Sequence, residues 1–422
     1  MIHIASRVSD PAVRRLTTTL YGYAFLSDLV LLYPLYVVFF ADTGLSVGQI
    51  SSLFVVWSAA GILFEVPSGA WADVVSRRLL LCLAPLVAAA GFALWVSLPS
   101  YPAFAVGFLL WGAGGALVSG ALEALVWTEL DRLGAVDRYA RVLGRARTAG
   151  VLGVVLSGVL AGPVLAAGGY PAIGAASVLA CLLAAVVAAR LPEHRLPAAG
   201  SPRSPSELDD DGDLGWWETL RAGLTQVRTR PPVRAAVLLV AVVAADWGAL
   251  DEYTPLLALD TGVGAKVVPL LLLLLWAGVT IGGLLAPVGE RLGRRGYAAL
   301  LGVVGVALGG GALLRHPGGF GLLAVAFGAA QLATVLADAR LQARIVGNSR
   351  ATVTSMAGMA TDLLIIGTYA GYGLIATAAG NAVAFAVTAG PYLVLGLVLL
   401  TRRRRGTGVP TGGTASVVRG PD

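Results

Sequence analysis

The sequence predicts an all-α membrane protein of twelve transmembrane helices, in two pseudo-symmetric halves of six helices, with the N and C termini in the cytoplasm. Composition is the first observation: 57% of the 422 residues are apolar, 13% are charged, and mean hydropathy is +0.80. A soluble domain would be about 25% charged. The second observation is a repeat, in which the segment 69–78 recurs at 286–295 and the segment 42–44 recurs at 260–262, an offset close to half of the chain. The third is the distribution of basic residues.

Apolar runs long enough to cross a bilayer define the expected helices. About 20 apolar residues are needed to cross about 30 Å of hydrocarbon. The first run is too long for a signal-peptide core, so we expect it to remain in the protein. The twelve runs lie at 17–40, 47–72, 79–98, 102–128, 146–168, 171–190, 234–258, 267–288, 297–314, 319–339, 352–377 and 382–400.

The basic residues fix the expected orientation of these helices. With both termini inside, 28 of the 30 basic residues fall in cytoplasmic segments, and only Lys266 and Arg315 fall outside. Basic loops stay in the cytoplasm during insertion. The division that follows is an N-terminal half (1–190), a cytoplasmic linker (191–233), a C-terminal half (234–401) and a basic cytoplasmic tail (402–422).

The linker is the one long polar stretch between apolar runs. Its first part contains Pro-Ser repeats and three consecutive aspartates at 209–211, which is typical of a disordered segment. Trp216 and Trp217 then begin a segment that could form a short helix lying at the membrane surface.

The repeated segment at 69–78 and 286–295 resembles the cytoplasmic loop signature of the major facilitator superfamily. That signature reads Gly-x-x-x-Asp-Arg/Lys-x-Gly-Arg-Arg/Lys, and each copy here departs from it, with Ser76 for the second glycine and Glu290 for the aspartate. The resemblance implies that these side chains hold one conformation at the cytoplasmic face; the alternative is that the arginines only fix topology. The gating set is Gly69, Asp73, Arg77, Arg78, Glu290, Arg291, Gly293, Arg294 and Arg295.

The fifth run carries a second family-like pattern. Gly158 and Gly162 are four residues apart, which gives a flat face for close helix approach, and Pro163 follows. The pattern is similar to the family's exporter-associated signature, with generic small-residue packing as the alternative. The arginine that many drug–proton antiporters of this family carry in span four is absent.

Carboxylates inside the apolar runs are the candidate proton and substrate path. A charge facing lipid at the bilayer centre costs at least about 2.5 kcal/mol, so these groups should face a wet cavity or be protonated. The alternative for each is a hydrogen-bonded structural acid, which is the interpretation we give to Asp251 and Glu252. In order, the candidates are Asp28, Asp246, Glu123, Glu65 and Asp362. Asp28 and Asp246 occupy equivalent positions in the two copies of the repeat.

Several other functions have no support in the residues. Cys82 and Cys181 lie in apolar runs without ligand spacing, the three histidines lie outside the runs, and the single lysine, Lys266, follows alanine rather than the glycine of a phosphate-binding loop. We therefore expect no enzyme activity, no catalytic residue, no metal, no cofactor and no nucleic-acid partner. An ion gradient, proton by preference, would supply the energy.

The sequence thus predicts a secondary transporter working by alternating access, a proton-coupled exporter of cationic or neutral amphiphilic molecules such as drugs or metabolites. No run has a basic residue near its centre, and tyrosines and tryptophans are frequent in the runs, which favours cations over organic anions. The alternatives are a proton-coupled uptake symporter for a small nutrient and, third, a non-transporting membrane protein or a permease subunit that needs a separate ATPase.

The expected location is the inner membrane of a bacterium, because the chain is rich in arginine, alanine, glycine and valine and poor in lysine. The expected partners are a small-molecule substrate and the lipid bilayer, and we expect a monomer. Substrate identity, direction, proton stoichiometry and the role of 191–233 stay open at the level of sequence.

Overall fold

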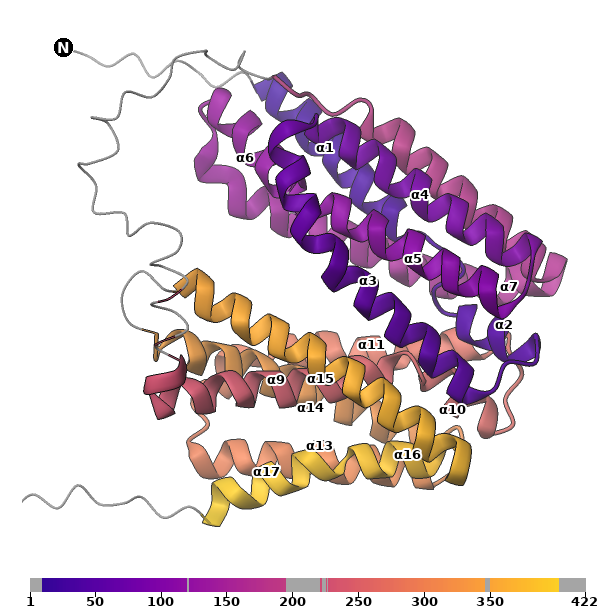
Figure 1. The fold of residues 1–422 in the computed structure, drawn as a ribbon, viewed down its shortest axis with the longest axis vertical. Coiled ribbons are helices and arrows are strands. Elements are labelled where there is room, and N and C mark those ends of the chain that lie inside the picture. The colour runs from indigo at the N-terminus through magenta and orange to yellow at the C-terminus, as the bar shows by residue number, and fades with distance from the viewer. Residues whose placement is uncertain are drawn as a thin grey trace, which may run out of the picture.

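The computed structural model describes residues 10–119, 121–194, 227–345 and 350–401, together with residues 221 and 225. Within these ranges the chain is helical and contains no strand, which confirms the all-α prediction. Two groups of helices lie one above the other, and the described chain begins and ends at the same side of the molecule (Figure 1). The basic tail and most of the predicted linker, including Trp216 and Trp217, lie outside the described residues.

In the N-terminal half, α1 packs mainly against α7, α4 packs against α5 and α7, and α3 packs against α5. The second arm of α7 turns back at Gly169 (φ 65°), so Ser177 lies beside Leu32 while Val187 lies beside Gly22. Its elements are α1 (Asp10–Asp28), α2 (Tyr36–Asp42), α3 (Val47–Val74), α4 (Arg77–Ser97), α5 (Tyr101–Val118), α6 (Ala121–Arg132), a 3₁₀ turn η1 (Val136–Arg138) and α7 (Tyr139–Ala188).

The C-terminal half repeats this plan with some differences in where helices are interrupted. Its elements are α9 (Pro231–Asp251), α10 (Thr254–Asp260), α11 (Val268–Leu284), α12 (Ala286–Gly289), α13 (Arg294–Leu313), α14 (Gly319–Gln342), α15 (Arg350–Ala379), α16 (Asn381–Thr388) and α17 (Gly390–Thr401). In the described ranges, nine helical stretches are long and apolar enough to cross a membrane. The count of twelve crossings and the cytoplasmic termini stay predictions.

The first and seventh predicted spans are each interrupted rather than continuous. Residues 29–35 separate α1 from α2, and residues 252–253 separate α9 from α10. Pro255 lies in the first turn of α10, where the missing N–H of proline costs no helical hydrogen bond. Discontinuous helices of this kind frequently line the substrate path of transporters.

The sequence repeat has a structural counterpart in the short helices. Helices α2 and α10 begin and end at equivalent positions of the two copies. The hydroxyls of Thr43 and Thr261 donate to the carbonyls of Phe40 and Ala258, each over 2.7 Å. Gly44 and Gly262 follow with φ of 90° and 85°, a left-handed conformation that favours glycine. The duplication therefore extends to the geometry of helix termination.

The two halves join at one end of the molecule, which we call the closed end, where α2 and α10 lie (Figure 1). Tyr170, beside the turn at Gly169, donates to Asp42 of α2. Asn381, beside the turn at Gly380, donates to Asp260 of α10, so both turns lie at this end. There the Tyr253 hydroxyl donates to Ser51 Oγ over 2.8 Å, and the ring centroid of Phe54 lies 5.3 Å from that of Tyr253. One buried apolar cluster extends through both halves, and a second is confined to α1, α4, α6 and α7 with the segments that flank them. The opposite side, where α1 begins and α17 finishes, is called the terminal end below.

Candidate functional site: an acidic and aromatic cavity between the halves

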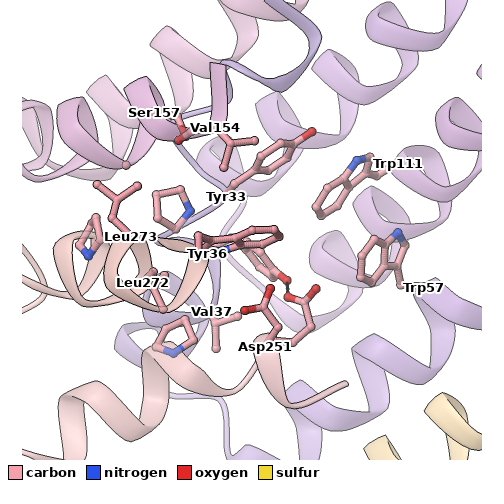
Figure 2. A pocket seen from close by; sticks show the side chains of 16 residues that line it. Tyr33, Tyr36, Val37, Trp57, Trp111, Val154, Ser157, Asp251, Leu272 and Leu273 are labelled. Carbon is pink, nitrogen blue, oxygen red and sulfur yellow. Dashed lines mark hydrogen bonds between the residues drawn. The ribbon is translucent and has the colours of Figure 1, made fainter. Parts of the chain in front are cut away.

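A cavity of about 290 Å³ lies between the two halves near the closed end (Figure 2). The N-terminal half contributes side chains from the α1–α2 connection and from α2, α3, α5 and α7. The C-terminal half contributes side chains from α9, α10, α11 and the α9–α10 connection. Because the interruptions in both broken spans face this space, we call it the central cavity.

One wall of the central cavity is a stack of aromatic rings from the N-terminal half. The Trp111 ring lies parallel to Tyr33 at a centroid distance of 5.2 Å and to Trp57 at 4.8 Å. Tyr36 meets Trp111 edge-on at 5.9 Å. Stacked rings offer an extended π face, which attracts organic cations as well as flat apolar groups.

The facing wall carries two adjacent carboxylates from the C-terminal half. Asp251 is the last residue of α9, and Glu252 follows it in the interruption. The Tyr36 hydroxyl donates a hydrogen bond to Glu252 Oε2 across the boundary between the halves. Figure 2 shows Tyr36 pointing toward the acidic wall at Asp251. None of the described residues that line this cavity is basic. The cavity can therefore neutralise a cation but not an anion.

A second cavity of about 380 Å³ lies within the N-terminal half and shares Tyr33 and Trp111 with the first. Asp28 lines it at the end of α1, together with Glu123 and one cation, Arg147. A Cβ at Gly150 would overlap Asp28 Oδ2, so only glycine leaves space for this carboxylate.

A third cavity of about 530 Å³ lies between α3 and α5 of one half and α9 and α15 of the other. Glu252 and Trp57 line both this cavity and the central one. Asp362 lines its α15 side, and Ser119 marks the interruption between α5 and α6. Three of the five candidate acids, Asp28, Glu123 and Asp362, therefore line cavities that adjoin the aromatic stack.

Asp246 has a different environment from Asp28, although it occupies the repeat-related position. It lies within α9, and Thr368 of α15 donates to its Oδ1 over 3.1 Å. Its Oδ2 is buried and has no hydrogen-bond partner among the described residues. Asp246 does not line the three cavities above. The candidate set is thus divided between two places in the protein.

The remaining candidate acids are less enclosed or lie in a segment without described side chains. Glu123 is exposed at the start of α6. The side chains of residues 65–74, which include Glu65, Gly69 and Asp73, lie outside the described part of the structure. Within the described residues no group of three or more His, Cys, Asp or Glu could hold a metal ion.

The candidate gating arginines bond within their own halves at the terminal end. Arg77 Nη1 donates to Ala124 O (3.1 Å) and to Thr128 Oγ1 (3.0 Å), while Arg294 Nε donates to Leu399 O (2.5 Å). The Arg77 backbone N–H also donates to Glu193 Oε1 over 2.8 Å. Arg78, Glu290, Arg291, Gly293 and Arg295 are exposed.

The glycines of the fifth predicted span face the other half of the protein. A Cβ at Gly158 would lie 3.0 Å from Leu273, and one at Gly162 would lie 2.6 Å from the carbonyl oxygen of Lys266. Both contacts are made with α11 or the turn before it. The glycine face therefore contributes to the junction at the closed end.

Sequence reasoning missed several residues that the structure brings to these sites. The sequence favours structural roles for Asp251 and Glu252, and it does not predict that Trp111 and Trp276 line a cavity. The repeat contains a usable signal, because its offset relates Tyr33-Pro34 to Asp251-Glu252. Glu193, which also accepts a hydrogen bond from Ser76 Oγ, has no such signal.

Comparisons with known proteins agree with this architecture. A sequence profile described as "Major Facilitator Superfamily" matches residues 19–366. No curated protein sequence matches the chain significantly.

Solved structures with the same fold include three transporters. A nucleoside transporter has a TM-score of 0.69 at 13% identity over 91% of this chain and 98% of its own. A bacterial homologue of the human lysosomal transporter Spinster, in an inward-facing and unoccupied conformation, has 0.66 at 16% over 94% and 95%. A D-xylose-proton symporter has 0.64 at 17% over 92% and 97%. At these identities the likeness establishes the fold alone.

Proposed function

The chain belongs to the major facilitator superfamily, and from that premise we propose that it is a proton-coupled exporter of cationic or neutral amphiphilic small molecules. Membership makes it a multi-pass membrane transporter rather than an enzyme. The observation that carries the substrate class is the central cavity, with Asp251 and Glu252 facing the rings of Tyr33, Trp57 and Trp111 and no basic lining residue among those described. An organic anion would meet uncompensated repulsion in this space.

Coupling follows from competition for the same carboxylates. In the proposed cycle, a cation binds between the aromatic stack and the deprotonated carboxylates of Asp251 and Glu252. Protonation of these carboxylates weakens the attraction and releases the cation. The Tyr36–Glu252 hydrogen bond joins the halves at the closed end. Cation binding or protonation at Glu252 would alter this bond, which links occupancy to rocking of the halves.

The hydrogen bonds of Arg77 and Arg294 lie within each half, whereas the hydrogen bonds between the halves, among the described residues, lie near the closed end. With cytoplasmic termini, this arrangement corresponds to a cytoplasm-facing conformation. The glycine face of Gly158 and Gly162 favours export. We assign this face to the junction between the halves at the closed end, which must separate when the cavity opens to the outside.

Transport in oriented proteoliposomes tests the proposal. An imposed pH gradient is followed with a pH-sensitive dye while organic cations, neutral amphiphiles and organic anions are added, with and without a protonophore. We expect cations and neutral amphiphiles, but not anions, to dissipate the gradient, and the protonophore to stop their transport. A preference for anions would overturn the substrate class, and indifference to the protonophore would overturn the coupling.

Two variants examine the role of the other acids in the same assay. Asp28→Asn and Asp246→Asn, singly and together, are expected to abolish pH-driven transport and to leave the protein folded. Full pH-driven transport by the double variant would remove both residues from the proton path. Uptake is the second candidate, since the same cavity chemistry serves a symporter, and the neighbours include a D-xylose-proton symporter. Only a substrate that accumulates on the cytoplasmic side would favour it.

A further inference from the structure

Five arginines surround a pocket of about 1010 Å³ at the terminal end of the N-terminal half, which we call the arginine pocket. It lies between the start of α1 and the segment formed by η1 and the start of α7. Asp137 is the one carboxylate among its described lining residues, so the lining has a formal charge of four positive units. The arginines are Arg14, Arg15, Arg138, Arg141 and Arg145.

The fold holds these like charges together instead of dispersing them. Arg141 and Arg145 are four residues apart, so they are neighbours on one face of α7, and both are exposed. Like charges at this spacing destabilise a helix. Packing of α1 against α7 adds Arg14 and Arg15 to the same pocket. A phosphate group bound among these guanidinium groups would relieve their repulsion and accept several charge-assisted hydrogen bonds.

An exposed apolar stripe begins beside the arginine pocket and continues along α7. Leu152, Val155 and Val159 follow Arg145 at helical spacing on the same face, with 57%, 40% and 47% of their surfaces exposed. From Arg145 to Val159 the helix rises about 21 Å, which exceeds the hydrocarbon thickness of one leaflet. A cationic pocket continuous with such a stripe matches an anionic headgroup with attached acyl chains, and a soluble anion would use only the pocket.

We propose that the arginine pocket binds the headgroup of an anionic phospholipid in the leaflet at the terminal end, with an acyl chain along Leu152, Val155 and Val159. Basic pockets between membrane helices on the cytoplasmic side are known to bind anionic headgroups. This site is separate from the central cavity and does not depend on the proposed transport activity.

Lipid titration of the purified full-length protein tests the site. Native mass spectrometry counts bound lipids while phosphatidylglycerol or phosphatidylcholine is added to the detergent solution. We expect phosphatidylglycerol to be retained in preference to phosphatidylcholine. The double variant Arg141→Gln/Arg145→Gln should bind phosphatidylglycerol roughly 30-fold more weakly. The matched control Arg228→Gln/Arg230→Gln removes two exposed arginines that line none of the cavities above, and it should bind as the wild type does.

The outcomes of this titration and two further measurements distinguish a bound lipid from a soluble anion or from nonspecific binding. Equal retention of both lipids, or equal weakening in the control, would overturn the proposal. Inorganic phosphate at the concentration of the lipid should not displace phosphatidylglycerol, and displacement would identify a soluble anion as the occupant. If the double variant is not monodisperse, Arg145→Gln alone is compared with the wild type by the thermal stabilisation that phosphatidylglycerol produces. A melting-temperature shift equal to that of the wild type would contradict the site.

Discussion

The two halves contribute different chemistry to the central cavity from positions that the repeat makes equivalent. Tyr33 and Pro34 of the first half correspond in the repeat to Asp251 and Glu252 of the second, and all four residues line the cavity. The duplicated backbone supplies two interrupted helices that face one another. Divergence at the interruption then made one wall aromatic and the other acidic, so the chemical difference between the two walls came from side chains and required no new fold.

The same comparison separates Asp28 from Asp246. The α1 helix finishes at Asp28, and that carboxylate lines a cavity. In contrast, α9 continues beyond Asp246 to Asp251, and Asp246 accepts a hydrogen bond from Thr368 of α15. The longer first helix of the second half therefore places its cavity-lining acids, Asp251 and Glu252, closer to the closed end. Equivalent positions in a repeat need not have equivalent roles.

Neutralising the acidic wall should have the largest effect. Asp251→Asn/Glu252→Gln keeps side-chain size and an acceptor for Tyr36, but it removes the charges that attract the substrate. Loss of one partner of a desolvated charge pair costs at least about 2 kcal/mol. We expect kcat/KM for cation transport in proteoliposomes to fall at least about 30-fold. Asp131→Asn, at an exposed acid near the end of α6 that lines none of the cavities, is the control, and an equal fall there would contradict the assignment.

Breaking the bond between the walls should have the next largest effect. Tyr36→Phe keeps the ring and removes the hydrogen bond to Glu252, and a bond to a charged group is worth about 1.5–3 kcal/mol. The conformational equilibrium should shift about tenfold toward separation at the closed end. Spin labels at the exposed positions Ser46 and Gly264, on opposite halves, measure the distance change. Tyr33→Phe removes a hydroxyl from the same cavity without affecting a contact between halves, so a similar shift there would refute the interpretation.

Weakening the aromatic wall should discriminate between substrates. Trp111→Leu leaves an apolar residue but removes the ring at the centre of the stack, and a cation–π contact contributes about 0.5–2 kcal/mol. The apparent affinity for cations should fall about fivefold, and that for neutral amphiphiles should fall less. Trp127→Leu, on the exposed face of α6, serves as control. Equal losses for both substrate classes would show that the ring contributes packing alone.

The smallest expected effect is a difference in stability between two hydrogen bonds at the closed end, one in each half. Tyr170 donates to Asp42 over 2.5 Å in one half, and Asn381 donates to Asp260 over 2.9 Å in the other. Asp42→Ala and Asp260→Ala should each cost about 1 kcal/mol of stability. Asp260→Ala should cost more, because Asn381 is buried and would lose the acceptor of its side-chain N–H. Thermal unfolding in detergent measures both, and the reverse order would contradict this account.

Much of the fold was predictable because crossing a membrane demands long apolar helices. The expected runs 47–72 and 297–314 correspond to α3 (Val47–Val74) and α13 (Arg294–Leu313) within a few residues. The interruptions after Asp28 and Asp251 were not predicted, since apolar composition continues through them. Their local signals, Pro34 and Pro255, are common in membrane helices and do not by themselves mark a break.

Less of the site was predictable, because hydropathy does not say which face of a helix meets which neighbour. Acid and ring types were identified, yet Glu252 meets Tyr36 only through the packing of segments that are far apart in the chain. Asp28 became a candidate from its depth in the span, and its space depends on Gly150 of a different helix. Such pairings follow from tertiary arrangement rather than from local pattern.

Lys266 gives this architecture a built-in reporter. It is the single lysine of the chain, its side chain is exposed, and its carbonyl oxygen lies against Gly162 at the junction of the halves. An amine-reactive reagent that cannot cross membranes would therefore modify one side chain at a known place. Labelling of Lys266 in intact cells, separated by peptide mapping from labelling of the α-amino group, would reveal which side of the membrane the closed end faces. A labelling rate at Lys266 that changes with substrate would report its opening without any engineered cysteine.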